Sequence, residues 1–306
     1  MKVIVTGGAG FIGSHLVDAL IARGDEVHVL DNLSTGKLQF KNPQASLHLV
    51  NICSETAKKI IIQLKPDAVF HLAAQADVSK SILDPKYDAE VNLIGTINIL
   101  EACRDASVKK FIFASTSAVY GNLQKEIIRE DDPVHPASYY GLSKLAAENY
   151  IRIFYELYQL PFTILRYANV YGPRQLPKGE GGVIAVFLDH IQNKKSLSIH
   201  GDGEQSRDFI FVKDIVTANL AALDNENQQI FHASTAKKTS INQVVDILSD
   251  LHGVKIDSAR TKERIGDIKH SCLDNHKIVQ TLKWVPQIDI LEGLSKTYAY
   301  QLQKVN

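Results

Sequence analysis

Residues 3–16 of the 306-residue chain read VIVTGGAGFIGSHL, a short β-branched run that passes through glycines into an apolar pattern of helical spacing. Gly7, Gly10 and Gly13 suit a strand-to-helix turn in which the chain bends sharply and its backbone approaches a diphosphate closely. The first turn of such a helix presents free N–H groups and the positive end of the helix dipole to the phosphates. The stretch therefore predicts the phosphate-binding turn of a dinucleotide site.

A second predicted strand, residues 26–30, is followed by Asp31, which stands about 20 residues beyond the turn. A carboxylate at this place accepts hydrogen bonds from both hydroxyls of an adenosine ribose, and it repels a 2′-phosphate. The two features together favour NAD over NADP as the cofactor. The alternative is a glycine-rich turn that binds nothing, and the position of Asp31 argues against it.

The first half of the chain alternates between strand-like and helical patterns. Short runs, several of them apolar throughout as buried parallel strands are, predict strands at residues 2–6, 26–30, 47–51, 68–72, 110–115 and 162–166. Helical patterns occupy residues 10–23, 60–64, 88–106 and 139–158. The alternation predicts an α/β fold with a Rossmann-type doubly wound parallel sheet, whose ligands bind at the carboxyl ends of the strands.

The second half of the chain is less regular. A loop at residues 171–182 precedes a strand-like run at 196–200, a loop at 201–207, and helical patterns at 183–192, 213–223 and 241–252. We therefore expect a NAD-binding domain over residues 1–168. A smaller C-terminal α/β lobe, mainly for substrate, is expected over residues 169–306, with some segments returning to the main domain.

Composition narrows the classes of partner. The chain carries 34 basic and 34 acidic residues without a basic stripe, which argues against nucleic acid or an anionic membrane as the main partner. Cys53, Cys103 and Cys272 lie far apart without a CxxC spacing, so neither a disulfide nor a metal site is expected. With no signal peptide and no membrane-spanning stretch in this sequence, we expect a cytoplasmic protein.

The segment SYYGLSK, residues 138–144, contains the candidate chemical pair. Tyr140 and Lys144 stand at i and i+4 of a helical pattern, which puts them on one helix face. A phenol with an unperturbed pKa of ~10 is a poor base, and a neighbouring ammonium favours its ionised form. A surface tyrosine beside a solvated lysine is the alternative, and Tyr139 lacks a lysine at i+4. Following a dinucleotide-binding half, the pair predicts a proton acceptor for a carbinol that loses hydride.

The chain resembles the extended short-chain dehydrogenase/reductase family over nearly its whole length, and within that family the UDP-sugar 4-epimerases. The segments that carry the resemblance are TGGAGFIGSH, LDNLSTG, HLAAQ, NLIGTINILEA, STSAVYG, YYGLSK, LRYANVYGPRQ, DGEQSRDFIFVKDI and RIGD. Their combination is far more specific than any one of them. The resemblance implies the same fold, NAD as cofactor, a UDP-sugar as substrate and a homodimer paired through the helices at 88–106 and 139–158, although packing within one chain explains their apolar faces equally well.

The resemblance also implies which residues hold the cofactor and the reacting hydroxyl. Thr116 matches the residue that hydrogen-bonds this hydroxyl, and Lys144 the one that bonds the nicotinamide ribose. Asn51 stands where the family has aspartate beside adenine, and its amide oxygen is still able to accept a hydrogen bond. The cofactor set implied is Gly7, Gly10, Phe11, Ile12, Gly13, Asp31, Asn32, Ser34, Gly36, Asn51, Ile52, Leu72, Ala73, Ala74, Gln75, Asn92, Tyr140, Lys144 and Tyr167.

For the substrate, the resemblance points to the second half of the chain. Arg207 and Arg264 match two arginines that clamp the diphosphate, for which planar guanidiniums are suited; surface ion pairs are the alternative. Ser271 matches a gatekeeper position, where a serine leaves room for an N-acetyl group that a tyrosine would exclude. The implied substrate residues are Thr116, Asn169 at the diphosphate, Val183 and residues 198–200 near uracil, Arg207, Arg264, Asp267 at the ribose, and Ser271.

The triplet Thr116-Ser117-Ala118 decides between reactions on this scaffold. Dehydratases and decarboxylases that resemble it carry acids at these following positions, and this chain has none. Plain oxidation and re-reduction at C4 remains, so we expect a NAD-dependent 4-epimerase of UDP-glucose/UDP-galactose and, from Ser271, of UDP-N-acetylglucosamine/UDP-N-acetylgalactosamine as well. A nucleotide-sugar ketoreductase with net redox turnover and a non-catalytic NAD-binding regulator stay open as alternatives.

Overall fold

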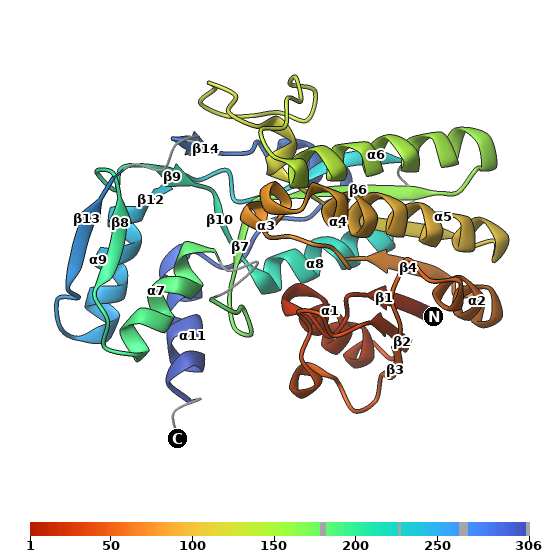
Figure 1. Ribbon diagram of the computed structural model, residues 1–306, viewed down its shortest axis with the longest axis horizontal. Coiled ribbons are helices and arrows are strands. Elements are labelled where there is room, and N and C mark those ends of the chain that lie inside the picture. Colours follow the sequence, from red (N-terminus) through yellow and green to blue (C-terminus); the bar gives the residue numbers. More distant parts are fainter. Residues whose placement is uncertain (178–181, 226–227, 263–268, 304–306) are drawn as a thin grey trace.

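A seven-stranded parallel sheet forms the centre of the molecule (Figure 1). The computed structural model describes residues 1–177, 182–225, 228–262 and 269–303. The strands are β1 (Lys2–Thr6), β2 (Glu26–Asp31), β3 (Ser46–Leu49), β4 (Ala68–His71), β5 (Lys110–Thr116), β6 (Phe162–Tyr167) and β11 (Gln229–Ala233). Their order is β11-β6-β5-β4-β1-β2-β3. From β1 to β3 each new strand is added on one side of the sheet, and from β4 on each is added on the other side, so the strand order has its change of direction between β1 and β4. The predicted doubly wound α/β sheet is confirmed, with its ligand crevice expected at that change of direction.

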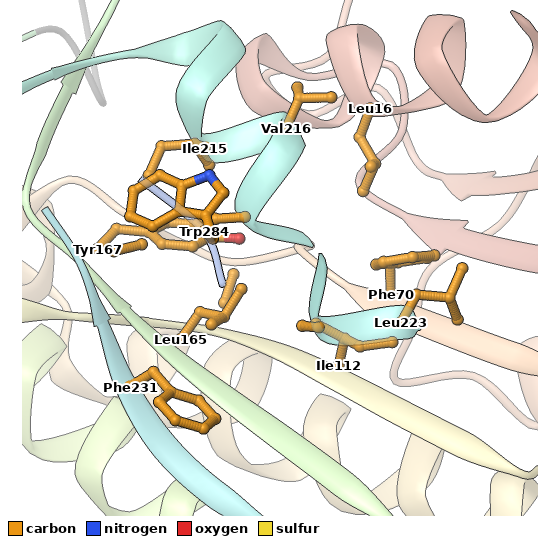
Figure 2. Packing of buried hydrophobic residues seen from close by; sticks show 14 of the residues in the cluster. Leu16, Phe70, Ile112, Leu165, Tyr167, Ile215, Val216, Leu223, Phe231 and Trp284 are labelled. Carbon is orange, nitrogen blue, oxygen red and sulfur yellow. The ribbon is translucent and has the colours of Figure 1, made fainter. Parts of the chain in front are cut away.

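Helices cover both faces of the sheet. Side chains along each buried strand point alternately to the two faces, and each face packs in its own core. Val3 and Val5 of β1 pack with α1 (Phe11–Ala22) and α8 (Val212–Leu223). Ile4 faces the opposite layer of α2 (Glu55–Leu64), α5 (Gly95–Asp105) and α6 (Tyr139–Tyr158). In the first core Phe70, Ile112 and Leu165 line up under α8, as Figure 2 shows. Both faces are buried, which explains why the predicted strands read as apolar runs.

The helix predicted over residues 88–106 is present as an unbroken helical path from Pro85 to Asp105, but its hydrogen-bond pattern changes along the way. It is divided into α4 (Pro85–Ala89), a π-helical turn η2 (Glu90–Ile94) and α5, and the short α3 (Val78–Leu83) precedes it. Within this turn the carbonyl of Asn92 accepts a hydrogen bond from the Thr96 hydroxyl at 2.6 Å. The side chain of Asn92 is bonded to residues outside the helix, a tertiary arrangement that helical periodicity does not reveal.

The second half builds a smaller body beside the sheet, on the left of Figure 1. A third core joins Phe187, Phe211, Val244 and Leu294. Its elements are β7 (Asn169–Tyr171), α7 (Val183–Gln192), β8 (Leu197–His200), β9 (Ser206–Arg207), β10 (Phe209–Phe211), β12 (Thr239–Ser240), α9 (Ile241–His252), β13 (Ser258–Thr261), β14 (His270–Ser271) and α11 (Ile290–Gln303). Helix α10 (His276–Leu282) packs instead on β11 of the main sheet, with Ile278 and Leu282 in the first core. The helices at 183–192 and 241–252 have the predicted bounds, whereas β9 lies within the predicted loop and β11, from beyond residue 168, belongs to the main sheet.

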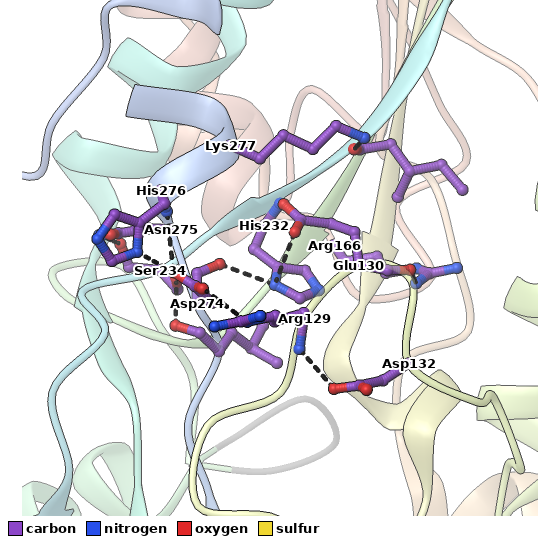
Figure 3. A network of polar contacts seen from close by, with 12 residues as sticks. Arg129, Glu130, Asp132, Arg166, His232, Ser234, Asp274, Asn275, His276 and Lys277 are labelled. Atoms are coloured by element: carbon purple, nitrogen blue, oxygen red, sulfur yellow. Dashed lines mark hydrogen bonds and ion pairs between the residues drawn. The ribbon is translucent and has the colours of Figure 1, made fainter. Parts of the chain in front are cut away.

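A buried polar network fixes α6 on the sheet. Glu148 of α6 accepts hydrogen bonds from Ser115 of β5 and from Arg166 of β6, the Arg166 Nη2–Glu148 Oε2 distance being 2.6 Å. Arg166 also donates to the Tyr120 hydroxyl, which bonds His232 of β11. Figure 3 shows how His232 continues the network to Glu130 and Asp274. Because each of these charged groups is paired, the network orders α6 one turn beyond Lys144 without leaving an isolated buried charge.

Within the described ranges no helix is long and apolar enough to cross a membrane. The same residues contain no group of three or more His, Cys, Asp or Glu side chains placed to hold a metal ion.

Candidate active site

A cavity of ≈ 270 Å³ opens at the carboxyl ends of the strands, beside the change of direction between β1 and β4. It brings together most of the residues predicted for the cofactor. Its lining includes Gly7, Gly10, Phe11, Ile12, Gly13, Asp31, Asn32, Ser34, Asn51, Ile52, Leu72, Ala73, Ala74, Gln75, Tyr140, Lys144 and Tyr167. Gly36 and Asn92 lie behind these residues rather than in the lining.

The glycine-rich turn is shaped by close backbone contacts. Gly7 has a φ of +70°, and a Cβ on it would lie 2.8 Å from the Ala73 nitrogen. A Cβ on Gly13 would overlap the carbonyl oxygen of Gly7. The turn therefore folds only without these side chains, and it leaves the first N–H groups of α1 facing a cavity that fits a dinucleotide diphosphate.

Asp31 lies at the end of β2 with its carboxylate fixed in direction. Its Oδ2 accepts from the Ala9 nitrogen at 3.0 Å and its Oδ1 from the Leu33 nitrogen at 2.8 Å. Gly36 packs against it, since a Cβ there would lie 2.9 Å from Oδ1. Each carboxylate oxygen keeps a further lone pair for a ribose hydroxyl, so the site fits an adenosine with a free 2′-hydroxyl.

The two polar residues next to the ribose site hold their own loops. Asn32 Oδ1 accepts from the Ser34 nitrogen at 3.0 Å, and Asn51 Oδ1 accepts from the Cys53 nitrogen at 2.9 Å. The amide oxygen that we expected to meet adenine therefore also closes a turn at the start of α2. Any adenine contact of Asn51 uses the second lone pair of that oxygen or the amide NH2.

A buried network forms the floor of the cavity. Asn92 Oδ1 accepts from the Gln75 nitrogen at 2.8 Å, and its Nδ2 donates to the Gln75 carbonyl at 2.9 Å. The same amide donates to Ser143 of α6, and Ser143 donates to Asp88 at 2.6 Å. The loop after β4, the π-helical turn and α6 are thus held to one another directly below Tyr140 and Lys144.

Tyr140 and Lys144 lie on the cavity side of α6, as their spacing predicted. Lys144 is 3% exposed, donates to the Ala114 carbonyl at 2.7 Å and lies 4.5 Å from the centre of the Phe113 ring. Its ammonium is therefore fixed, close to where a phenolate would form. Helix α6 begins close to the segment that follows β5, because a Cβ on Gly141 would lie only 2.6 Å from the Ala118 carbonyl.

Thr116 ends β5 and begins the short 3₁₀ helix η3 (Ser117–Tyr120). Its Oγ1 accepts from the Ala118 nitrogen at 3.1 Å, which fixes the hydroxyl oxygen and leaves its proton to donate. Tyr167, predicted near the nicotinamide, lines the cavity with its ring. Its hydroxyl exchanges hydrogen bonds with Asn219 of α8, and burial raises the pKa of Tyr167. Tyr167 is thus a poor proton acceptor, which leaves Tyr140 as the candidate.

The predicted substrate residues fall into three groups. Asn169, Arg207 and Ser271 come together: Ser271 pairs with Arg207 across β14 and β9, and the Asn169 nitrogen donates to the carbonyl of Asp208 at 2.8 Å. Val183 begins α7, and residues 198–200 lie in β8, both in the smaller body. Arg264 and Asp267 lie outside the described residues.

Sequence reasoning missed part of the cavity wall. Asp77, Lys80, Tyr87 and Val91 also line it, from the segment of α3, α4 and η2. Lys80 Nζ lies 4.4 Å from the centre of the Tyr87 ring. The local indication of a helix in this segment is Asp77, a residue type preferred at helix N-caps. Its side chain accepts from the Ser79 and Lys80 nitrogens at the start of α3.

The fold, the glycine-rich turn and the Tyr140–Lys144 pair at the cavity are together typical of one class of protein, the dinucleotide-dependent enzymes that act on a carbinol. Residues 3–233 match the model of the NAD dependent epimerase/dehydratase family. The chain belongs to this family, and NAD is its cofactor.

Similar proteins cover the whole chain. A putative UDP-glucose 4-epimerase of Methanocaldococcus jannaschii is 43% identical over 96% of both chains. The structure of a UDP-glucose 4-epimerase of Thermotoga maritima, solved with UDP-glucose, superposes with a TM-score of 0.97 at 41% identity over 100% of both chains. That of a UDP-N-acetylglucosamine 4-epimerase of Methanobrevibacter ruminantium gives 0.94 at 37% identity, over 99% of this chain and 98% of that one.

Replacing Gly13 with alanine is expected to weaken NAD retention by about tenfold or more, or about 1.4 kcal/mol, because the new Cβ overlaps the Gly7 carbonyl and displaces the turn. The measurement is the NAD released from purified, acid-denatured protein. Gly182→Ala is the matched control, since its Cβ would meet only Gln175 Nε2 at 3.6 Å. Equal NAD content in a folded Gly13→Ala protein contradicts the assignment of the turn.

Proposed function

We propose that this protein is an isomerase that inverts C4 of a UDP-sugar through a transient 4-keto sugar, with NAD held tightly throughout. The observation that carries the proposal is that Tyr140 and the fixed Lys144 both line the cavity, together with a Thr116 at the end of β5 that is followed by no acid. Support comes from the similar proteins, which are named UDP-sugar 4-epimerases.

The bound NAD supplies a hydride acceptor and donor at C4. Tyr140, as phenolate, takes the proton of the C4 hydroxyl, while the Thr116 hydroxyl donates a hydrogen bond to the sugar oxygen. Lys144 stabilises the phenolate, and its bond to the Ala114 carbonyl keeps the ammonium in place. After the sugar turns over, Tyr140 returns the same proton to the carbonyl oxygen, so neither protons nor electrons are consumed over the cycle.

Turnover of the sugar requires that only its nucleotide end is held. We assign this end to Asn169 and Arg207, with Arg264 and Asp267 of the segment RIGD. Guanidiniums bind a diphosphate through paired donors, which anchors the nucleotide while the pyranose rotates about its bond to the phosphate. Both faces of C4 then meet the same Tyr140.

Tyr140→Phe should lower the rate of C4 inversion by about 10²-fold or more, since a phenyl group can neither take nor return the proton. The measurement is proton NMR of the anomeric signals of UDP-glucose, with no cofactor added, together with the NAD content. Tyr139→Phe is the control, because Tyr139 is 49% exposed and lacks a lysine at i+4.

Equal activity of the two variants contradicts the role of Tyr140. An unmutated protein that is silent on UDP-glucose and UDP-N-acetylglucosamine contradicts the epimerase itself. If product then forms only when reduced cofactor is added, the protein is the net ketoreductase. If it binds NAD without any turnover, it is the non-catalytic regulator.

We further propose that Ser271 admits an N-acetyl group at C2 of the sugar, so that UDP-N-acetylglucosamine is a substrate as well. Ser271 is buried and pairs with Arg207, which places a small side chain beside the assigned diphosphate site. Ser271→Tyr should remove activity on the acetylated sugar and spare that on UDP-glucose, while Ser271→Ala keeps both. Parallel loss of both activities in the tyrosine variant refutes the gatekeeper.

We also propose a cytoplasmic homodimer. Leu142, Tyr150, Ile153 and Leu157 are exposed along one stripe of α6, and Ile94 is exposed in the neighbouring η2, an apolar face suited to a second copy of the chain. All three cysteines are free thiols, which suits a reducing compartment. Light scattering should give twice the chain mass, and a monomer in solution contradicts the dimer; cell fractionation tests the compartment.

A further inference from the structure

Asp208 occupies a buried position between β9 and β10 that neither the cofactor site nor the reacting residues explain. Its side chain is 1% exposed, and donors surround it. Oδ1 accepts from the Thr235 nitrogen at 2.9 Å and the Thr235 hydroxyl at 2.7 Å. Oδ2 accepts from the Ala236 nitrogen at 3.0 Å and the Leu273 nitrogen at 3.4 Å, with the Cys272 thiol at 3.9 Å.

These contacts join the segments that carry the assigned substrate residues. Asp208 follows Arg207 directly, and its carbonyl accepts from the nitrogen of Asn169 in β7. Leu273 lies two residues beyond Ser271, whose strand β14 pairs with β9. Asn169, Arg207 and Ser271 are therefore all linked to one buried residue, through its backbone on one side and its carboxylate on the other.

The carboxylate is a costly group to place there. Burial raises the pKa of Asp208 to about 6, against which its hydrogen bonds work. An apolar side chain of similar size would fill the space without this cost, but it would not hold these five donors at fixed positions. Burial of the carboxylate is thus unfavourable in free energy, and its hydrogen bonds fix the positions of the surrounding segments.

We propose that Asp208 is a positioning residue for the UDP-sugar: its carboxylate fixes the spacing of Asn169, Arg207 and Ser271, so that the diphosphate meets a preformed clamp. The inference rests on the proposed function. Tyr140, Lys144 and Thr116 belong to other elements, α6 and β5, and the cofactor turn to α1. Losing the Asp208 carboxylate therefore weakens substrate binding and leaves the chemical step and NAD retention in place.

The test compares Asp208→Asn with Asp214→Asn. Asp214 is equally buried, and its two oxygens accept from the Gln287 and Ile288 nitrogens, in a segment to which no site residue is assigned. Both variants replace an acceptor-only carboxylate by an amide that faces N–H donors, so both lower the midpoint of thermal unfolding. Only Asp208→Asn should raise KM for the UDP-sugar and Kd for UDP, by about 10- to 100-fold, the equivalent of one or two hydrogen bonds to a charged group. Its kcat and NAD content should match those of Asp214→Asn.

Thr235→Val is a milder second variant, since it removes one donor to Asp208 and keeps the shape of the side chain. It should raise KM and Kd in the same direction by less, with an unchanged kcat. Unchanged KM and Kd in both variants, or an equal rise in Asp214→Asn, overturns the inference alone. Absence of UDP binding by the unmutated protein overturns the proposed function and this inference with it.

Discussion

At Gly7 and Gly13 the backbone of the β1–α1 turn approaches itself and the loop after β4 more closely than any residue with a Cβ allows. This contact places the start of α1 at the change of direction between β1 and β4, and the cavity forms there. Asp31, from the next strand, is fixed by the Ala9 nitrogen of the same turn. One steric requirement thus shapes the part of the cavity that we assign to the diphosphate and the ribose, and the remaining parts of the proposed site are arranged around it.

The reacting side of the cavity depends on how α6 is held. Lys144 is bonded to Ala114 of β5, and Glu148, one turn later, to β5 and β6. On the other side of the helix Ser143 joins the floor made by Asn92 and Asp88. The residues to which we assign the chemistry therefore lie on a helix fixed from two sides. The proposed substrate residues Asn169, Arg207 and Ser271 lie on two- and three-residue strands that depend on buried contacts such as those of Asp208.

The sequence predicted features whose signal is local. Apolar runs gave six strands of the sheet, and α6, α7 and α9 have their predicted bounds. Prediction from the sequence failed where contacts between distant segments determine the local structure. Strand β11 contains His232, a polar residue that is buried because Tyr120 and Asp274 satisfy it, and the π-helical turn depends on distant bonds of Asn92. Lys80 reaches the cavity from a helix with no motif. The roles given to Asn51, Arg207 and Ser271 stay predictions, and Arg264 and Asp267 lie outside the described residues.

The central claim is that hydride leaves C4 and returns to the same molecule within one closed site. The most direct test is turnover of UDP-glucose that carries deuterium at C4 and ¹³C in its sugar carbons, in water and mixed with UDP-glucose that carries neither label, followed by mass spectrometry of substrate and product. The account predicts that deuterium stays at C4 of the inverted sugar, without loss to water and without crossover to unlabelled molecules. Deuterium lost to solvent would indicate proton chemistry at carbon instead. Crossover would show that the reduced cofactor or the 4-keto sugar leaves the site before the hydride returns, and either result contradicts the account.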